Sequence, residues 1–290
     1  MASNAKATHK SAEFKKMVLS YPLKKQPIIA VGRRRIAGNE LYGAKGLAIY
    51  EPNQLIYIVN SGHCSIQIVT FEGNFVTSFG QEVLKKPWGI AVTEDNIFIT
   101  DNHFMTLFQF SDIKIARTGT RGSGEGELIS PTGLCVDYNR DVYVADSRND
   151  RVCIFSEDLT FINCLGTQQL KYPVDVNVTP NSIVVLDCNS NCIHFYSRSG
   201  YLINSCVSQG VYGIVYNPWF FCLDPVGNIL ISNLLCNNIK ILFPSGGLIH
   251  IIGRGGHGRG ELSQPRGIGI SQLGIIFIVS INDNFHLQSF

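Results

Sequence analysis

The sequence predicts an all-β fold, a six-bladed β-propeller closed into a ring, on three observations. A unit of four short strand patterns recurs at intervals of about 41 to 47 residues across nearly the whole chain. The last copy of this unit stops after three strands. A fitting fourth strand stands near the N-terminus, so the two ends of the chain are expected to share one blade.

The clearest copy of the unit runs from Gly119 to Gly166 and shows what one blade contains. A glycine-rich connection, GTRGSGEGEL, precedes four apolar runs: TGLCVD, DVYVAD, RVCIFS and FINCLG. Asn, Asp, Ser and Glu residues separate the runs, and several of these favour chain reversals. The pattern predicts four antiparallel strands, called A to D in chain order.

The remaining copies follow the same order of strands. In blade 5 the connection before strand A departs from the pattern, with Tyr212 and Gly213 in place of the usual residues. Blade 6 has only PRGIGIS, IIFIVS and FHLQSF, so its strand D is missing. Strand A begins close to Gly46 in blade 1, then Pro87, Pro131, Pro173, Pro218 and Pro265 in blades 2 to 6.

The N-terminal region supplies a candidate for the missing strand. KKQPIIAVGRRRIAGNEL, from Lys24 to Leu41, matches LIHIIGRGGHGRGEL, from Leu248 to Leu262, which is a strand D with its connection. We therefore expect this segment to complete blade 6 and to remove the open sheet edges of the array. Residues 1–17 are predicted to be a polar, basic tail or linker, and residues 18–290 the propeller.

The repeated motifs resemble the NHL repeat. They are GxGxGEL, PxGxxVD, a hydrophobic-VAD pattern, NxRVxxF and a final hydrophobic-G pair, and the likeness covers Gln26 to Phe290. Six copies resemble the NHL domains that end many tripartite-motif (TRIM-NHL) proteins. The resemblance implies a platform that binds RNA or protein partners. The best-matched positions are Gly122, Gly124, Gly126, Pro131, Gly133, Asp137, Asp146, Asn149 and Arg151.

The carboxylates and glycines of the repeats have two interpretations each. Asp101, Asp146 and Asp187 follow strand B in their blades, where a ring of carboxylates suggests a metal site. Short acidic side chains also cap turns, and Asp146 has Arg151 nearby as an ion-pair partner, so we favour a structural role. The glycine-rich connections open no predicted helix and lack a GK[ST] ending, so we expect positive φ angles rather than a phosphate loop.

Histidines and cysteines form no predicted catalytic or metal site. His63 and His103 occupy equivalent connections of adjacent blades. The resemblance extends to propeller lyases, whose metal-binding histidines lie near the start of strand C. No third histidine stands at that position in the other blades. No Ser, His and Asp set can be placed together. The 9 cysteines lack framework spacing and are interpreted as thiols, the CxxxC of Cys188 and Cys192 included. We predict no enzyme activity, cofactor or metal; a metal-dependent propeller lyase or hydrolase is the distant alternative.

Charge separates the two faces of the predicted ring. A propeller places its D-to-A and B-to-C connections on one face and its A-to-B and C-to-D turns on the other. Cations exceed acids on the first, here called the basic face, whereas Glu94, Asp95, Glu157 and Asp158 belong to an acidic opposite face. Trp88 is interpreted as a packing residue. The predicted binding residues are Arg33, Arg34, Arg35, Tyr42, Lys85, Lys86, Phe104, Arg121, Arg148, Lys171, Tyr172, Arg254, Arg259 and Arg266.

These patterns favour a non-catalytic binding platform. Cations interleaved with aromatic side chains suit RNA, single-stranded or structured, on the basic face. A protein-docking platform, for example one that recruits substrates to a ubiquitin ligase, is the alternative. The sequence shows neither a secretory signal pattern nor an apolar run of about 18 residues. We therefore expect a cytoplasmic protein with a monomeric propeller, no membrane contact and no small-molecule substrate.

Overall fold

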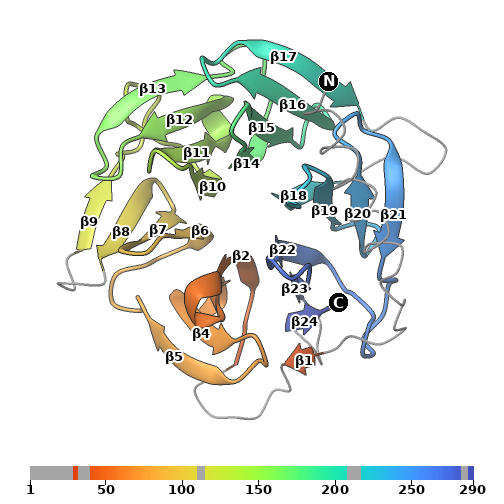
Figure 1. Ribbon diagram of the computed structural model, residues 1–290. Helices are drawn as coiled ribbons and strands as arrows, with labels where there is room; N and C mark the ends of the chain where they lie inside the picture. The colour runs from red at the N-terminus through yellow and green to blue at the C-terminus, as the bar shows by residue number, and fades with distance from the viewer. Residues whose placement is uncertain (1–28, 32–39, 110–114, 208–216, 282–286) are drawn as a thin grey trace.

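The computed structural model describes residues 29–31, 40–109, 115–207, 217–281 and 287–290, and these form six four-stranded antiparallel sheets (Figure 1). The sheets stand as blades around a central axis, with strand A of each blade innermost and strand D outermost. The prediction of an all-β, six-bladed propeller is therefore confirmed. Among the described residues, no helix has the length and hydrophobicity needed to cross a membrane.

The strand bounds follow the predicted runs closely. Blade 1 has β2 (Ala44–Tyr50), β3 (Leu55–Asn60), β4 (Ser65–Thr70) and β5 (Phe75–Phe79). Blade 2 has β6 (Pro87–Val92), β7 (Asn96–Asp101), β8 (Phe104–Gln109) and β9 (Ile115–Thr118). Blade 3 has β10 (Pro131–Val136), β11 (Val142–Asp146), β12 (Arg151–Phe155) and β13 (Phe161–Leu165). Blade 4 has β14 (Pro173–Val178), β15 (Ser182–Asp187), β16 (Cys192–Ser197) and β17 (Leu202–Val207). Blade 5 has β18 (Pro218–Leu223), β19 (Ile229–Asn233), β20 (Asn238–Leu242) and β21 (Leu248–Ile252). Blade 6 has β22 (Pro265–Ile270), β23 (Ile276–Ser280), β24 (Leu287–Ser289) and β1 (Ile29–Val31). Short 3-10 turns lie at Glu51–Asn53, Ser61–His63 and Ser147–Asn149.

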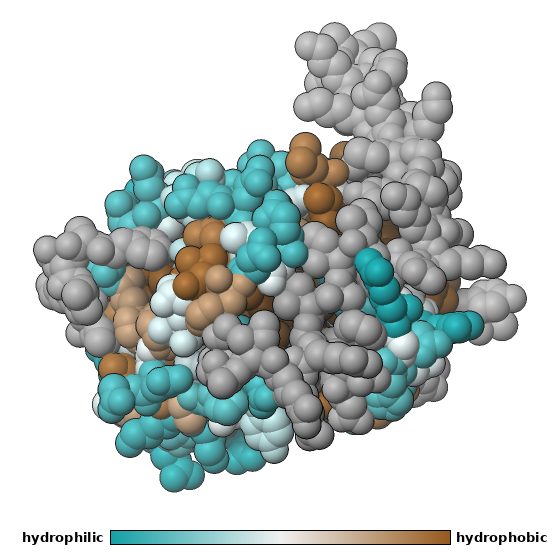
Figure 2. Space-filling model, turned by 90° about the horizontal axis from the view of Figure 1, so that it is seen from below, coloured by the Kyte–Doolittle hydropathy of each residue, from teal (hydrophilic) through white to brown (hydrophobic). Residues whose placement is uncertain are grey.

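The hydrophobic core lies between neighbouring blades. Phe98 and Met105 of blade 2 pack against Val144 and Phe155 of blade 3, and all four are fully buried. Both faces of each sheet are covered in this way, so strands B and C are buried almost throughout, as in β7 (NIFITD). The outer strands are more exposed, as in β5. Figure 2 shows the ring from its side, with hydrophilic residues along the two faces and hydrophobic residues between them.

The first and last blades pack on each other, which closes the ring. Ile56 and Ile58 of blade 1 share a buried cluster with Phe277 and Val279 of blade 6. In addition, β1 pairs with β24 in antiparallel register, Val31 opposite Leu287. The predicted segment from Lys24 to Leu41 otherwise lies outside the described residues, apart from its last two positions.

Each innermost strand carries an irregularity directly after its first residue. In β6, for example, Pro87 pairs with Asp101, but the register shifts before Ile90 pairs with Ile99. A register shift at this place occurs in all six innermost strands. In five blades the bulge takes the second and third residues out of the ladder and re-aims their side chains, whereas in blade 4 only Val174 is skipped and Asp175 pairs with Leu186. Pro218 of blade 5 begins β18 at the equivalent place, whereas Tyr212 and Gly213 lie outside the described residues.

Candidate binding face and axial mouth

Carboxylates at the ends of strand B fix the backbone of the basic face. Both oxygens of Asp101 accept the backbone N–H of Lys85, at 3.1 and 3.0 Å, and Oδ1 also accepts that of Lys86, at 2.5 Å. Asp187 Oδ2 accepts the N–H of Lys171 at 2.6 Å. Asp101 and Asp187 are buried, whereas the three lysines are exposed. The structural role predicted for these carboxylates is thus observed, and it points lysine side chains toward solvent.

The glycine-rich connection of blade 3 is fixed by a buried ion pair. Arg151 Nε donates to Asp146 Oδ2 at 3.1 Å, and the terminal nitrogens of Arg151 donate to the carbonyls of Ser123, Gly124 and Glu127 at 2.8 to 2.9 Å. Desolvation raises the pKa of Asp146, and its hydrogen bonds to Asn149 and Arg151 oppose this. The connection that presents Arg121 is therefore rigid.

The glycines of this connection differ from the prediction. Gly126 has the expected positive φ, 71°, but Gly122 and Gly124 do not. A Cβ on Gly122 would lie 2.0 Å from Oε2 of Glu127, whose carboxylate folds back to accept the N–H of Gly124 at 2.8 Å. Space for this carboxylate, rather than backbone freedom, requires glycine at position 122.

The structure places the predicted binding residues in three groups. Arg33, Arg34 and Arg35 lie outside the described residues. Two aromatic residues are less available than predicted: Tyr172 packs against the core between blades 4 and 5, and Phe104 is half-buried under the guanidinium of Arg117, at 5.7 Å. Eight residues are exposed on connections of the basic face, before blades 1, 2, 3, 4 and 6 and within blade 3: Tyr42, Lys85, Lys86, Arg121, Arg148, Lys171, Arg254 and Arg259.

Some of these exposed residues have local partners. Tyr42 is 67% exposed, and its ring meets that of His63 edge-on at 6.1 Å. Arg254 pairs with Glu261 at 2.9 Å. The remaining cations are spread around the face rather than gathered in one patch. Of the predicted residues that the structure describes, Arg266 alone lies at the start of an innermost strand, next to the axis.

Two tryptophans meet across the axis at the basic face. Trp88 follows the first residue of β6 and Trp219 follows the first residue of β18, in blades 2 and 5, on opposite sides of the ring. Their ring centroids lie 4.7 Å apart with an interplanar angle of 40°. The packing role predicted for Trp88 is observed, and its aromatic partner lies in the opposite blade.

Two cations from the adjoining blades 1 and 6 stand against these rings. Nζ of Lys45 lies 3.7 Å from the Trp88 centroid and 5.9 Å from that of Trp219, and Cζ of Arg266 lies 5.9 Å from the Trp219 centroid. Burial, and then the charge of Arg266, lower the pKa of Lys45 to about 8. Burial also lowers the pKa of Arg266. We call these four residues the axial mouth.

Sequence reasoning missed Lys45 and Trp219. A signal was present, because the four residues occupy one repeat position: they follow Ala44, Pro87, Pro218 and Pro265, the first residues of their strands. Aligning this position across the six blades gives Lys, Trp, Thr, Val, Trp and Arg, so the polar and aromatic members stand out.

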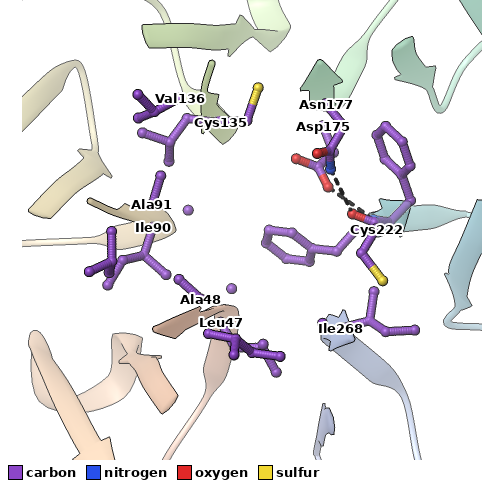
Figure 3. Close-up of a pocket in the computed structure, with 18 of the residues that line it drawn as sticks. Leu47, Ala48, Ile90, Ala91, Cys135, Val136, Asp175, Asn177, Cys222 and Ile268 are labelled. Carbon is purple, nitrogen blue, oxygen red and sulfur yellow. Dashed lines mark hydrogen bonds between the residues drawn. The ribbon is translucent and has the colours of Figure 1, made fainter. Parts of the chain in front are cut away.

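Below the axial mouth runs a channel of about 340 Å³, lined by all six innermost strands (Figure 3). Directly below the axial mouth lies the third residue of each innermost strand. This residue is glycine in four blades, which leaves room for the side chains of Asp175 and Phe220 in the other two. A Cβ on Gly133 would lie 1.9 Å from Oδ1 of Asp175, and one on Gly46 would lie 3.3 Å from the ring of Phe220. Desolvation raises the pKa of Asp175, whose carboxylate accepts the backbone N–H groups of Val176 and Phe221.

One set of residues in blade 4 resembles a catalytic arrangement that the sequence did not reveal. His194 Nδ1 lies 2.8 Å from Oγ of Ser205, and its Nε2 lies 3.8 Å from Asp187 Oδ2. The distance between Nε2 and Asp187 is too long for a hydrogen bond, and the Asp187 carboxylate already accepts backbone N–H groups. Desolvation lowers the pKa of His194, against the opposing effect of Asp187. Among the described residues, no three His, Cys, Asp or Glu side chains are grouped as metal ligands.

Comparison with known proteins finds similarity to one repeat family. The family model of the NHL repeat matches residues 128–155, in blade 3. Protein lin-41 of Caenorhabditis elegans is 53% identical over 45 residues, 16% of this chain and 4% of that protein. E3 ubiquitin-protein ligase NHLRC1 of Homo sapiens is 29% identical over 161 residues, 52% of this chain and 38% of that protein. The chain thus spans less than two fifths of the length of each of these two relatives.

Solved structures share the architecture with lower sequence identity. Virginiamycin B lyase from Staphylococcus aureus superposes with a TM-score of 0.62 over 87% of this chain and 85% of that chain, at 12% identity. At this identity the likeness shows the propeller fold alone, because one fold hosts many functions.

Proposed function

We propose that this six-bladed propeller, which carries an NHL repeat and resembles TRIM-NHL propellers, is a binding platform that takes single-stranded RNA on its basic face without catalysing a reaction. The observation that carries the proposal is the way buried carboxylates hold the backbone of the connections. Asp101 and Asp187 bind the N–H groups of Lys85, Lys86 and Lys171, and these side chains stand in solvent. Cations on a fixed backbone are suited to phosphate contacts.

The charge of the two faces supports an anionic ligand on one side only. On the opposite face acids outnumber cations among the described residues, and Arg140 is already paired with Asp95 and Glu157, at 3.1 and 2.9 Å. On the basic face Lys85, Lys86, Arg121 and Lys171 have no ion pair within the described part of the chain. Single-stranded RNA would meet free cations on this face and repulsion on the other.

The proposal is tested by measuring RNA binding as a function of salt. A labelled single-stranded RNA is titrated with the purified chain at several salt concentrations. Each phosphate contact releases counterions, so the logarithm of the affinity should fall with that of the salt concentration by about 0.7 per contact. Absence of RNA binding at low salt would contradict the proposal.

A protein-docking role is the second candidate, and the outer strand of blade 4 favours it. Tyr201 and Ile203 are 76% and 62% exposed and lie next to Leu202, at 41%. Such neighbouring apolar groups on an outer strand are typical of contact surfaces. The relative NHLRC1 is an E3 ubiquitin-protein ligase, so a substrate-recruiting surface is a reasonable form of this role. Replacing Ile203 with Lys would weaken the binding of a protein partner at this strand and leave the affinity for RNA unchanged.

A further inference from the structure

The axial mouth holds two cations without an acid to neutralise them. Among the described residues neither Lys45 nor Arg266 forms an ion pair or a hydrogen bond with a carboxylate, and each instead faces an indole ring. The Nε of Arg266 and the Nε1 atoms of Trp88 and Trp219 are buried and have no hydrogen-bond partner in the part of the chain that the structure describes. Lys45 and Arg266 are half-buried neighbours of the same charge and repel each other, so the axial mouth destabilises the folded protein when no anion is bound there.

The fold brings these groups together from separate blades. The bulges after Ala44, Pro87, Pro218 and Pro265 take the next residue of each strand out of its ladder. The two indoles meet on the axis at a tilt of 40°, and Phe220, almost fully buried, fills the level beneath them. The mouth therefore has an aromatic floor with cations on the side of blades 1 and 6, at the centre of the basic face.

We propose that the axial mouth is a seat for one phosphate group, held between the ammonium of Lys45 and the guanidinium of Arg266. Occupation neutralises both cations. Guanidinium and ammonium donors that approach from two blades suit the several oxygens of a tetrahedral phosphate better than the two oxygens of a carboxylate. The assignment of this phosphate to an RNA chain rests on the proposed function. The seat would then fix the middle of a strand whose flanks contact Lys85 and Lys171.

Both tryptophans of the chain belong to the axial mouth, so tryptophan emission reports on it directly. The full chain is titrated with inorganic phosphate at constant ionic strength, with acetate and chloride as comparison anions. The proposal expects a saturable change in emission for phosphate, weakened at least tenfold by Lys45→Gln. Arg140→Gln, which removes an exposed cation from the opposite face, should behave as wild type. An equal response to acetate, or the same phosphate affinity in Lys45→Gln, would overturn the proposal.

A thermal melt of Lys45→Gln shows whether the variant folds, and the wild type provides a second measurement that needs no substitution. Phosphate should produce a broadened, shifted ³¹P resonance with the wild type, and excess acetate should not reverse it. An unchanged resonance would overturn the proposal.

The same emission signal distinguishes this proposal from the proposed function. Labelled single-stranded RNA is followed by anisotropy while tryptophan emission is recorded. Binding that changes the emission and weakens in Lys45→Gln supports both proposals. Binding without any change in emission, and with equal affinity for Lys45→Gln, contradicts the axial seat and leaves the proposed function standing. Phosphate binding at the mouth without RNA binding supports the seat and contradicts the proposed function.

Discussion

The indole rings of Trp88 and Trp219 lie 4.7 Å apart, tilted by 40° to each other, across the axis of the propeller, although the two residues belong to opposite blades. Both follow a proline that starts an innermost strand, and a bulge takes both out of the ladder. The contact therefore arises from one repeat position used twice in a ring. It gives Lys45 and Arg266 a common aromatic surface.

The titration of Lys45 gives a prediction for pH. Its pKa of about 8 in the folded protein lies below the ordinary value of 10.5, because of burial and the charge of Arg266. Between these values the unfolded chain binds more protons, so this lysine makes the free energy of unfolding rise with pH from about 8 to 10.5. Tryptophan emission should show a step near pH 8. Lys45→Gln should lack the step, and an identical titration in that variant would contradict the assignment.

The buried carboxylate of Asp146 gives a prediction for stability. It accepts hydrogen bonds from the backbone of Ile129, from Asn149 and from Arg151, at 2.7, 2.7 and 3.1 Å. Asp146→Ala should destabilise the protein by about 3 to 5 kcal/mol, because it leaves a largely buried guanidinium without its acid. Glu94→Ala, an exposed control, should change the free energy of unfolding by less than about 0.5 kcal/mol. Denaturant unfolding measures both; equal effects would show that Asp146 is not needed to hold the connection.

The N-terminal strand gives a prediction about ring closure. Deletion of residues 1–32 removes β1 and leaves β24 without its outer partner, whereas deletion of residues 1–16 leaves β1 in place. The longer deletion should lower the melting temperature by more than about 5 °C, which corresponds to a few kcal/mol in a protein of this size. The shorter deletion should lower it little. Equal melting temperatures for the two truncations would mean that closure does not depend on this strand.

Metal content gives a prediction about catalysis. His63 stands against Tyr42, and the described residues offer no set of three metal-ligating side chains. The purified chain should therefore retain no stoichiometric zinc or calcium. Elemental analysis checks this. Retained metal that is lost in His63→Ala or His103→Ala would instead favour a propeller lyase or hydrolase.

The sequence predicted the fold well because each strand is a local pattern and the repeat restates it. The bounds of β6 and β7 coincide with the predicted runs PWGIAV and NIFITD. Asp146 and Arg151 were also predicted to pair, since they flank one short turn. The axial mouth was different, because Lys45 and Trp219 are far apart in the chain and meet only when the ring closes. The partial burial of Tyr172 was not predicted for a related reason: it packs against a cluster that two neighbouring blades form together.

The measurement that tests the central claim most directly is a comparison of RNA affinity between two variants of equal net charge. Lys85→Gln with Lys86→Gln removes two positive charges from the basic face, where Asp101 fixes the backbone without either side chain. Asn139→Glu with Asn181→Glu adds two negative charges to the opposite face, at exposed turn positions across the ring.

The account predicts that the lysine variant weakens binding of single-stranded RNA and lowers the salt slope by about 1.4, which corresponds to two phosphate contacts. The asparagine variant should bind as wild type, because its charges lie beyond the Debye length of about 8 Å. Equal weakening by the two variants would mean that only net charge matters, and unchanged affinity in the lysine variant would contradict RNA binding on the basic face.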